Sequence, residues 1–407
     1  MINFFNYYFN YFLTGLALTL LCVLGSAVGV FIHLQRKSLI ADALAHGMLP
    51  GICGAFLLVN DKDNPLVLLG GGIAALACFY IVEWSVGKMY AKADAAIAAT
   101  MSGFFGLGIL LITYIQRNPN GTSTGLDRIL FGSAAALTTI DLIYISIVAV
   151  PSVLYLIVFR RNLLFHIFDP AFLSIAGVDN RIGRVLLDVI TVGVIILGVK
   201  SLGVILISSV IVLPSSIASL LTRRGKAFFY FAVVIGFFSG VIGVVLSTFI
   251  PRLSTGPVVV LSMAVIFMSA LFLAPDTGLL SNYLMRIAHL QKVEIENTLK
   301  LLYIRQTEGS EVTSVKQSIL KSLYKKQYIY SNANSTLTST GLVEARRVVR
   351  LHRLWELYLS RKMYFATDHL HQDADAIEHI ITPEIEADLI QALNRPGQDP
   401  HASEIPY

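Results

Sequence analysis

Nine long apolar runs fill the first two thirds of this chain and limit what it can fold into. Each run is about 18–25 residues long, the length that an α-helix needs to cross the hydrocarbon core of a bilayer. Backbone polar groups inside a bilayer must be satisfied within the segment, so such runs form helices. We predict nine membrane-spanning helices, at residues 11–33, 39–59, 65–83, 95–116, 138–159, 184–200, 202–221, 226–250 and 256–274.

Composition agrees with this and divides the chain into two regions. The 407 residues are 55% hydrophobic and only 14% charged, which excludes an ordinary soluble protein. Residues 1–275 hold 16 Lys and Arg and 10 Asp and Glu, whereas the last 132 residues hold 15 and 16. We predict an all-α polytopic membrane domain at 1–275, a linker at 276–290 and a small, mainly helical soluble domain at 291–407.

The connecting loops predict an orientation. Loops on one side of the nine spans carry eleven Lys and Arg residues, and loops on the other side carry five. Because positive charge concentrates in cytoplasmic loops, the C-terminal domain is expected in the cytoplasm. The break between Lys200 and Gly203 decides the predicted number of spans. One long kinked helix there would place all later loops, and the C-terminal domain, on the opposite side of the membrane.

One apolar run contains two residues that a lipid-embedded helix rarely carries. In "LIADALAHGMLPG" (Leu39–Gly51), Asp42 and His46 are four residues apart and so share one helix face. A mid-bilayer carboxylate costs about 2.5–3.5 kcal/mol on insertion scales, so it usually faces a partner or a wet cavity. A carboxylate and an imidazole suit Mn²⁺, Fe²⁺ or Zn²⁺. A structural Asp–His hydrogen bond between helices is the alternative.

The other titratable residues in or near the spans are His33, Glu83, Asp94, Asp141, His166 and Asp188. Most of them lie close to predicted helix ends, where interfacial hydration accounts for them. Asp94 stands at a predicted helix start, where a negative charge interacts favourably with the helix dipole.

Five motifs resemble the permease subunits of bacterial ABC importers for manganese, zinc and iron. In chain order they are "LQRKSLIADALAHGMLPGICGAFLL" from Leu34, "KADAAIAATMSGFFGLGILL" from Lys92, "LDRILFGS" from Leu126, "FHIFDPAFLSIAGV" from Phe165 and "LGVILISSVIVLPSSIASLL" from Leu202.

The resemblance implies roles for particular residues and a set of partners. Asp42 and His46 would line the metal pathway, and Phe168–Gly177 would be the cytoplasmic coupling helix that docks on an ATPase, with Phe168, Asp169, Pro170, Ala176 and Gly177 among its residues. It further implies a bacterial plasma (inner) membrane location, an extracytoplasmic metal-binding protein and a second permease chain, identical or not.

No segment of the sequence matches GxxxxGK[ST], the loop that cradles nucleotide phosphates. We therefore expect a transport subunit rather than an enzyme, with no bound nucleotide of its own and with ATP hydrolysed by a separate subunit.

The region after Pro275 holds six of the nine histidines. "RLHRLWE" places His352 and Glu356 four residues apart, and "DHLHQDADAIEH" would place further imidazoles and carboxylates on one side of a helix. A solvated helix surface is the alternative.

Residues 337–393 are similar to the metal-binding and dimerisation region of the diphtheria toxin repressor family. That resemblance implies a regulatory Mn²⁺ or Fe²⁺ site whose ligands are His352, Glu356, His371, Asp375, Glu378 and His379.

The stretch before it resembles the same family's winged helix-turn-helix but departs from it. Asn297 and Lys300 stand where the family's first-helix acidic ligands are usual, and the span from Gln306 to Ser318 is short for the two helices that precede a recognition helix. We expect a degenerate winged helix and a dimer-forming sensor, and consider DNA binding doubtful.

Two other functions are compatible with the sequence. A membrane-tethered or released repressor would need DNA binding by the tail, which gel shifts would detect. A permease for a metal chelate such as a siderophore would need a wide cavity without ligands, against which Asp42 and His46 argue.

Overall fold

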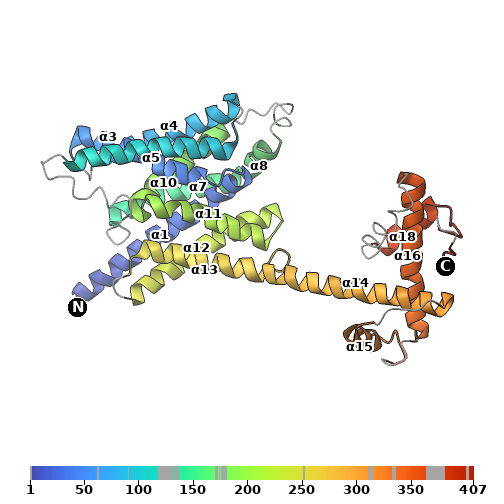
Figure 1. Ribbon diagram of the computed structural model, residues 1–407. Helices are drawn as coiled ribbons and strands as arrows, with labels where there is room; N and C mark the ends of the chain where they lie inside the picture. The colour runs from blue at the N-terminus through green and yellow to red at the C-terminus, as the bar shows by residue number, and fades with distance from the viewer. Residues whose placement is uncertain are drawn as a thin grey trace. The chain divides into compact units, whose positions relative to one another are not determined.

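The chain forms two compact units, residues 1–281 and 282–407 (Figure 1). Their boundary lies inside the segment 276–290 that the sequence predicts as a linker. The computed structural model describes residues 2–61, 64–89, 91–117, 132, 137–169, 173, 175, 181–250, 253–309, 315–331, 336–363, 381–399 and 403–407.

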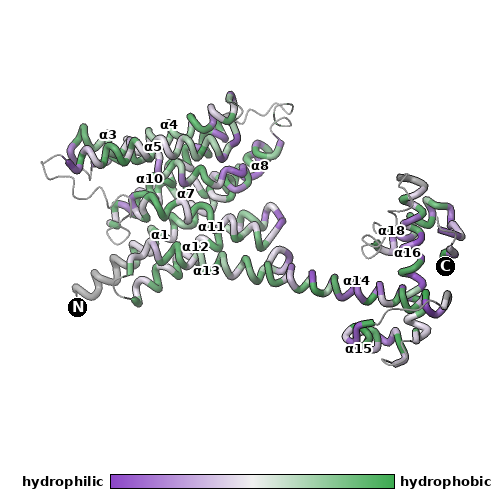
Figure 2. The backbone as a smooth tube through the Cα atoms, in the orientation of Figure 1, coloured by the Kyte–Doolittle hydropathy of each residue, from purple (hydrophilic) through white to green (hydrophobic). Residues whose placement is uncertain are grey.

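The first unit is a helical bundle in which most helices are long and apolar (Figure 2). In chain order they are α1 (Ile2–Leu34), α2 (Ile40–Gly47), α3 (Leu49–Val59), α4 (Pro65–Met89), α5 (Ala93–Arg117), α7 (Thr139–Val158), α8 (Arg160–Phe168), α10 (Arg181–Leu202), α11 (Val204–Leu221), α12 (Gly225–Phe249) and α13 (Thr255–Leu273). Within the described residues, nine segments are long and apolar enough to cross a membrane, α2 and α3 together making one of them. This confirms the predicted polytopic all-α fold.

Helix α1 forms the centre of the bundle and α5 lies at its periphery. About 78% of the span in α1 is buried, against 22% of the span in α5. Small residues let α1 approach its neighbours closely, as is usual between membrane helices. A methyl group added to Gly29 would lie 1.9 Å from the carbonyl oxygen of Ile211 on α11, and one added to Gly236 on α12 would lie 1.9 Å from the Ser26 hydroxyl.

The chain reverses sharply between α10 and α11. Gly203 has φ = 91°, a left-handed conformation that favours glycine. The two helices then pack together, because a methyl group on Gly198 would lie 2.1 Å from the side chain of Ile207. In one continuous helix these two residues would be about 13 Å apart along the axis. The structure therefore has two separate spans here, as the predicted count requires.

The second unit contains α14 (Leu279–Glu308), α15 (Gln317–Lys325), α16 (Ser339–Met363) and α18 (Pro383–Ala392). The second half of α14, α15 and the start of α16 bury a small common core that includes Leu299, Leu323 and Ala345. Outside the helices, the described residues of this unit form two isolated β-bridges, Ile329–Leu337 and Gln398–Glu404. The mainly helical tail is thus confirmed.

Ion pairs hold α18 and the chain end against α16. Arg350 donates to Glu386 on α18 from Nη2 at 2.5 Å and from Nε at 2.8 Å, and also reaches the carbonyl oxygen of Pro406 at 3.2 Å. Both nitrogens donate to one oxygen, Oε1, and such charge-assisted hydrogen bonds are stronger than neutral ones.

Candidate functional site

Asp42 and His46 lie side by side on α2, inside the second span. The Nε2 atom of His46 is 3.5 Å from Oδ1 of Asp42, and the two side chains are 21% and 37% exposed respectively. Metal–ligand distances are about 2.1 Å, so two ligands at a tetrahedral angle lie about 3.4 Å apart. The observed separation therefore fits two ligands of one ion.

Helix α5 orients the imidazole. The rings of His46 and Phe105 form a T-shaped contact with centroids 4.9 Å apart, and the Nδ1 atom of His46 is buried without a hydrogen-bond partner among the described residues. The described residues contain no group of three or more His, Cys, Asp or Glu placed to hold a metal. Within the described residues, a single chain therefore offers an ion two side-chain ligands here, Asp42 and His46.

A helix break follows the pair directly. Pro50 has no N–H to give to the carbonyl of His46, and α2 ends at Gly47 before α3 resumes at Leu49. Close packing holds both short helices in place: a methyl group on Gly51 would lie 2.1 Å from the carbonyl oxygen of Gly70 on α4. The helix is therefore interrupted within a turn of the ligand pair while its position stays fixed.

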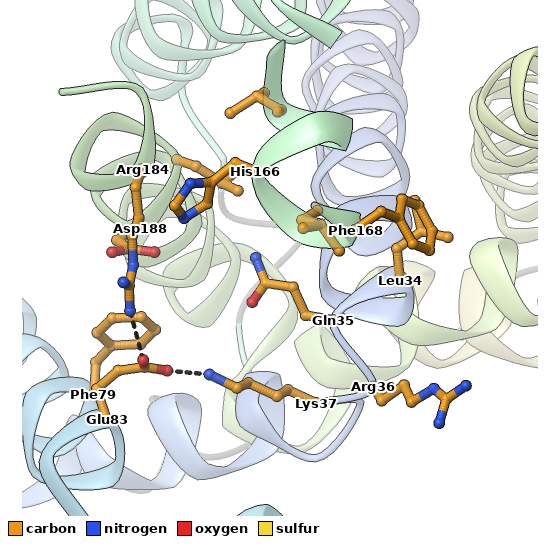
Figure 3. Close-up of a pocket in the computed structure, with 13 residues that line it drawn as sticks. Leu34, Gln35, Arg36, Lys37, Phe79, Glu83, His166, Phe168, Arg184 and Asp188 are labelled. Atoms are coloured by element: carbon orange, nitrogen blue, oxygen red, sulfur yellow. Dashed lines mark hydrogen bonds and ion pairs between the residues drawn. The ribbon is translucent and has the colours of Figure 1, made fainter. Parts of the chain in front are cut away.

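A cavity of about 480 Å³ lies at the bundle end that the charge bias predicts to be cytoplasmic (Figure 3). It is lined by the turn between α1 and α2 and by α4, α8 and α10. Glu83 on α4 joins two of these elements, since one carboxylate oxygen pairs with Lys37 in the turn and the other accepts from Arg184 Nη2 at 2.7 Å. Asp188, one turn after Arg184, is buried beside them.

His166 on α8 also lines this cavity. Burial and, to a smaller extent, the nearby Arg184 guanidinium lower the pKa of the imidazole below its ordinary value. The lowered pKa favours the neutral imidazole. The cavity connects α8, which precedes the expected coupling segment, with α10, which follows it, and with the turn that leads into α2.

The expected coupling segment is described in part. α8 ends at Phe168, whose side chain is 68% exposed, and the Asp169 N–H closes the helix by donating to the carbonyl of Phe165 at 2.8 Å. Ile175 is also exposed. Pro170, Ala176 and Gly177 lie outside the described residues.

Two of the six expected tail ligands are described, and they lie together on α16. Nε2 of His352 is 3.1 Å from Oε1 of Glu356, and both side chains are buried. His371, Asp375, Glu378 and His379 lie outside the described residues, so the full ligand set remains a prediction.

The winged-helix region is shorter than the complete fold. Eight residues separate the end of α14 at Glu308 from the start of α15 at Gln317, and those of them that are described contain no helix. α15 packs directly on the second half of α14, and the Ile329–Leu337 bridge follows it where a wing would lie.

Residues 5–274 match the ABC 3 transport family, which is well over half of the chain. The chain belongs to this family. Residues 338–407 of this transporter match the metal-binding and dimerisation domain of iron-dependent repressors. Both resemblances predicted from the sequence are thereby confirmed.

Relatives align with the transporter over different lengths. Manganese transport system membrane protein MntC of Bacillus subtilis is 33% identical over 370 residues, covering 86% of this chain and 85% of its own. Zinc transport system membrane protein TroC of Treponema pallidum is 34% identical over 263 residues, covering 64% and 88%. A probable metal transport system membrane protein of Chlamydia trachomatis is 26% identical and aligns with 96% of this chain, so that alignment includes the tail.

A solved structure shares the membrane fold. PsaBC from Streptococcus pneumoniae, in complex with a Fab, is 28% identical with a TM-score of 0.56, covering 67% of this chain and 93% of the other.

The sequence did not reveal that Glu83, Lys37 and Arg184 form one network. From the sequence, hydration at a helix end accounts for Glu83. The available signal is the charge of three residues near predicted span ends, but which of them meet depends on tertiary packing.

Proposed function

We propose that this transporter is the permease subunit of an ATP-driven importer that moves Mn²⁺ or Fe²⁺, with Zn²⁺ as the third candidate, inward across a bacterial plasma membrane. The single observation that carries the proposal is the Asp42–His46 pair, two metal-ligating side chains 3.5 Å apart inside a span. The names of the manganese and zinc relatives support a divalent transition metal as the substrate.

Incomplete coordination suits transport. Two ligands cannot hold an ion as tightly as the four of a closed structural site, so an ion bound by Asp42 and His46 can leave again. A second permease chain packed on the exposed face of α5 would cover the pair and add ligands. The low burial of α5, and the open space beside its Gly103 and Gly106, support this placement.

The partners follow from the same architecture. A separate ATPase subunit would dock on the Phe168–Gly177 segment and hydrolyse ATP, and an extracytoplasmic solute-binding protein would deliver the ion at the other end of the bundle. The distribution of Lys and Arg among the loops supports a cytoplasmic tail. In the tail, a site formed by His352, Glu356 and the four further predicted ligands would sense the same ion.

Metal uptake tests this function. Cells that carry the complete system should accumulate manganese or iron, measured together with zinc, and both Asp42→Asn and His46→Ala should reduce that uptake to background. Uptake should fall because each variant lacks one of the two proposed metal ligands. The amount of protein in the membrane should stay normal.

Asp61→Asn is the matched control. It makes the same chemical change in the loop after α3 and should leave uptake unchanged. Normal uptake by the Asp42 and His46 variants at equal expression would show that the pair is structural.

A further inference from the structure

Charge is unevenly distributed within the tail. Residues 277–336 contain eight Lys and Arg and four Asp and Glu, whereas residues 337–407 contain seven and eleven. The half that follows the last span is therefore basic, and the half that contains the predicted metal ligands is acidic. A net charge near zero for the whole tail conceals this separation.

α15 concentrates the basic charge on one face. Its apolar residues Ile319, Leu320 and Leu323 are buried against α14. Lys321 and Lys325, four residues apart, lie on the opposite, exposed face. Like charges at this spacing repel each other. No ion pair is found for either lysine among the described residues, so an anionic partner would relieve the repulsion.

Exposed tyrosines adjoin these lysines. Tyr324 lies within α15, and Tyr330 lies at the bridge that follows it; both are exposed. Tyrosine is typical of the membrane–water interface, where its ring meets the apolar boundary and its hydroxyl meets water.

The first half of α14 combines exposed apolar residues with basic ones. Its exposed apolar residues are Leu279, Leu280, Tyr283, Leu284, Met285, Ile287 and Leu290. Arg286 and Lys292 are its basic residues, and no Asp or Glu occurs from residue 277 to residue 293. Apolar and basic residues without acidic ones favour contact with the interface of an anionic membrane. α14 begins only six residues after α13 ends.

We propose that α15 and the first half of α14 form a docking surface for the anionic lipid headgroups of the membrane that the first unit spans. This proposal depends on the proposed function in one respect, the location of the tail on the cytoplasmic side of the membrane. The anionic cytoplasmic leaflet attracts lysine near its surface, and the apolar residues of α14 provide the contact with the acyl boundary. The acidic half of the tail is repelled by the same surface.

Lipid fits these residues better than nucleic acid does. A helix-turn-helix needs its supporting helices to present the recognition helix to a groove. Within the described part of the tail, α14 is the one helix that precedes α15, and eight residues join the two helices. Binding to a membrane surface does not require such supporting helices. A membrane surface is also always close to an integral membrane protein.

Amide hydrogen exchange of the full chain in nanodiscs tests the docking surface. Exchange over residues 317–326 should be slower in nanodiscs that contain phosphatidylglycerol than in phosphatidylcholine alone, by about fivefold for each engaged lysine. Lys321→Glu or Lys325→Glu should remove most of the difference, as should high salt, because salt screens the charges. Arg346→Glu is the control, since it reverses an exposed charge on α16 and should leave the difference intact.

Three results would overturn the proposal. Equal exchange in both lipids excludes a lipid surface. Protection by duplex DNA in neutral nanodiscs, without a lipid effect, assigns α15 to nucleic acid. Protection by inorganic phosphate in neutral nanodiscs indicates a site for a free anion. None of these measurements depends on transport, so they stand apart from a failure of the proposed importer function.

Discussion

At the scale of single residues, close packing and charge pairing place the same demand on the bundle: each group must meet its neighbour at a fixed distance. Gly29 and Ile211 show this for packing, and Glu83 with its two cationic partners shows it for charge. Both contacts join segments that are distant in sequence, so each can be tested by a substitution that leaves its own helix intact.

Gly29→Ala should destabilise the bundle. The new methyl group would lie 1.9 Å from the backbone oxygen of Ile211, which cannot move aside without shifting α11. Overpacking of this kind costs about 1–3 kcal/mol, which should appear as a lower thermal midpoint of the purified protein. Gly87→Ala on α4 is the control, because nothing lies within 4 Å of its added methyl group. Equal midpoints for the two variants would show that α1 and α11 are less closely packed than described.

Glu83→Gln should weaken the junction between α4, α10 and the turn before α2. The amide keeps the shape of the side chain but removes the negative charge that Lys37 and Arg184 share. Hydrogen bonds to charged groups contribute about 1.5–3 kcal/mol, so a loss within that range should appear in thermal unfolding. Lys316→Gln, which breaks an exposed pair with Glu294 in the tail, should have a much smaller effect. Unfolding of the Glu83 variant at the wild-type temperature would contradict this account.

At the scale of helices, α8 links the expected coupling segment to the rest of the bundle. Its end carries Phe168, and its inner face lines the same cavity as Glu83 and Arg184. Movement of the segment would therefore reach α10 and the turn into α2, on which Asp42 and His46 lie. If an ATPase subunit docks on that segment as proposed, this continuity would give a physical route between ATP hydrolysis and the ligand pair.

Phe168→Ala should reduce the stimulation of ATP hydrolysis in the assembled transporter by about tenfold, a loss of about 1.4 kcal/mol of contact with the ATPase. The exposed ring is proposed to fill a site on that subunit, so the variant should still fold and bind metal. Phe159→Ala is the control: it removes an exposed ring at the other end of α8. Full stimulation in the Phe168 variant would place the docking site elsewhere.

At the scale of the whole molecule, a sensor attached to a transporter is useful only if its occupancy changes transport. By linkage, an ion shifts the tail only through different affinities for its two states. The transporter that carries both Glu378→Ala and His379→Ala should therefore continue to import metal when the cytoplasm already contains enough of it. The wild-type transporter should stop importing under the same conditions. Radioactive manganese uptake in preloaded cells measures this.

Glu384→Ala with Asp388→Ala provides the control, since it also replaces two polar tail residues by alanine, at exposed positions of α18 outside the predicted ligand set. It should stop importing at the wild-type metal level. Arrest of the Glu378–His379 variant at that same level would show that the tail is not a feedback sensor.

The sequence alone determined the features that depend on local composition and spacing. Run length predicted nine spans, because bilayer thickness fixes how many apolar residues a helix needs. Spacing by four placed Asp42 beside His46 and His352 beside Glu356, because a helix brings such residues to one face.

Only the tertiary structure decided which separate segments meet. Glu83 joins Lys37 and Arg184, and Phe105 orients His46, across long intervals of sequence. Gly203 could have belonged to one kinked helix, and its positive φ together with the packing of Gly198 on Ile207 separated two spans. These contacts depend on the close fit of several helices at once, and the pattern within any one helix does not contain that information.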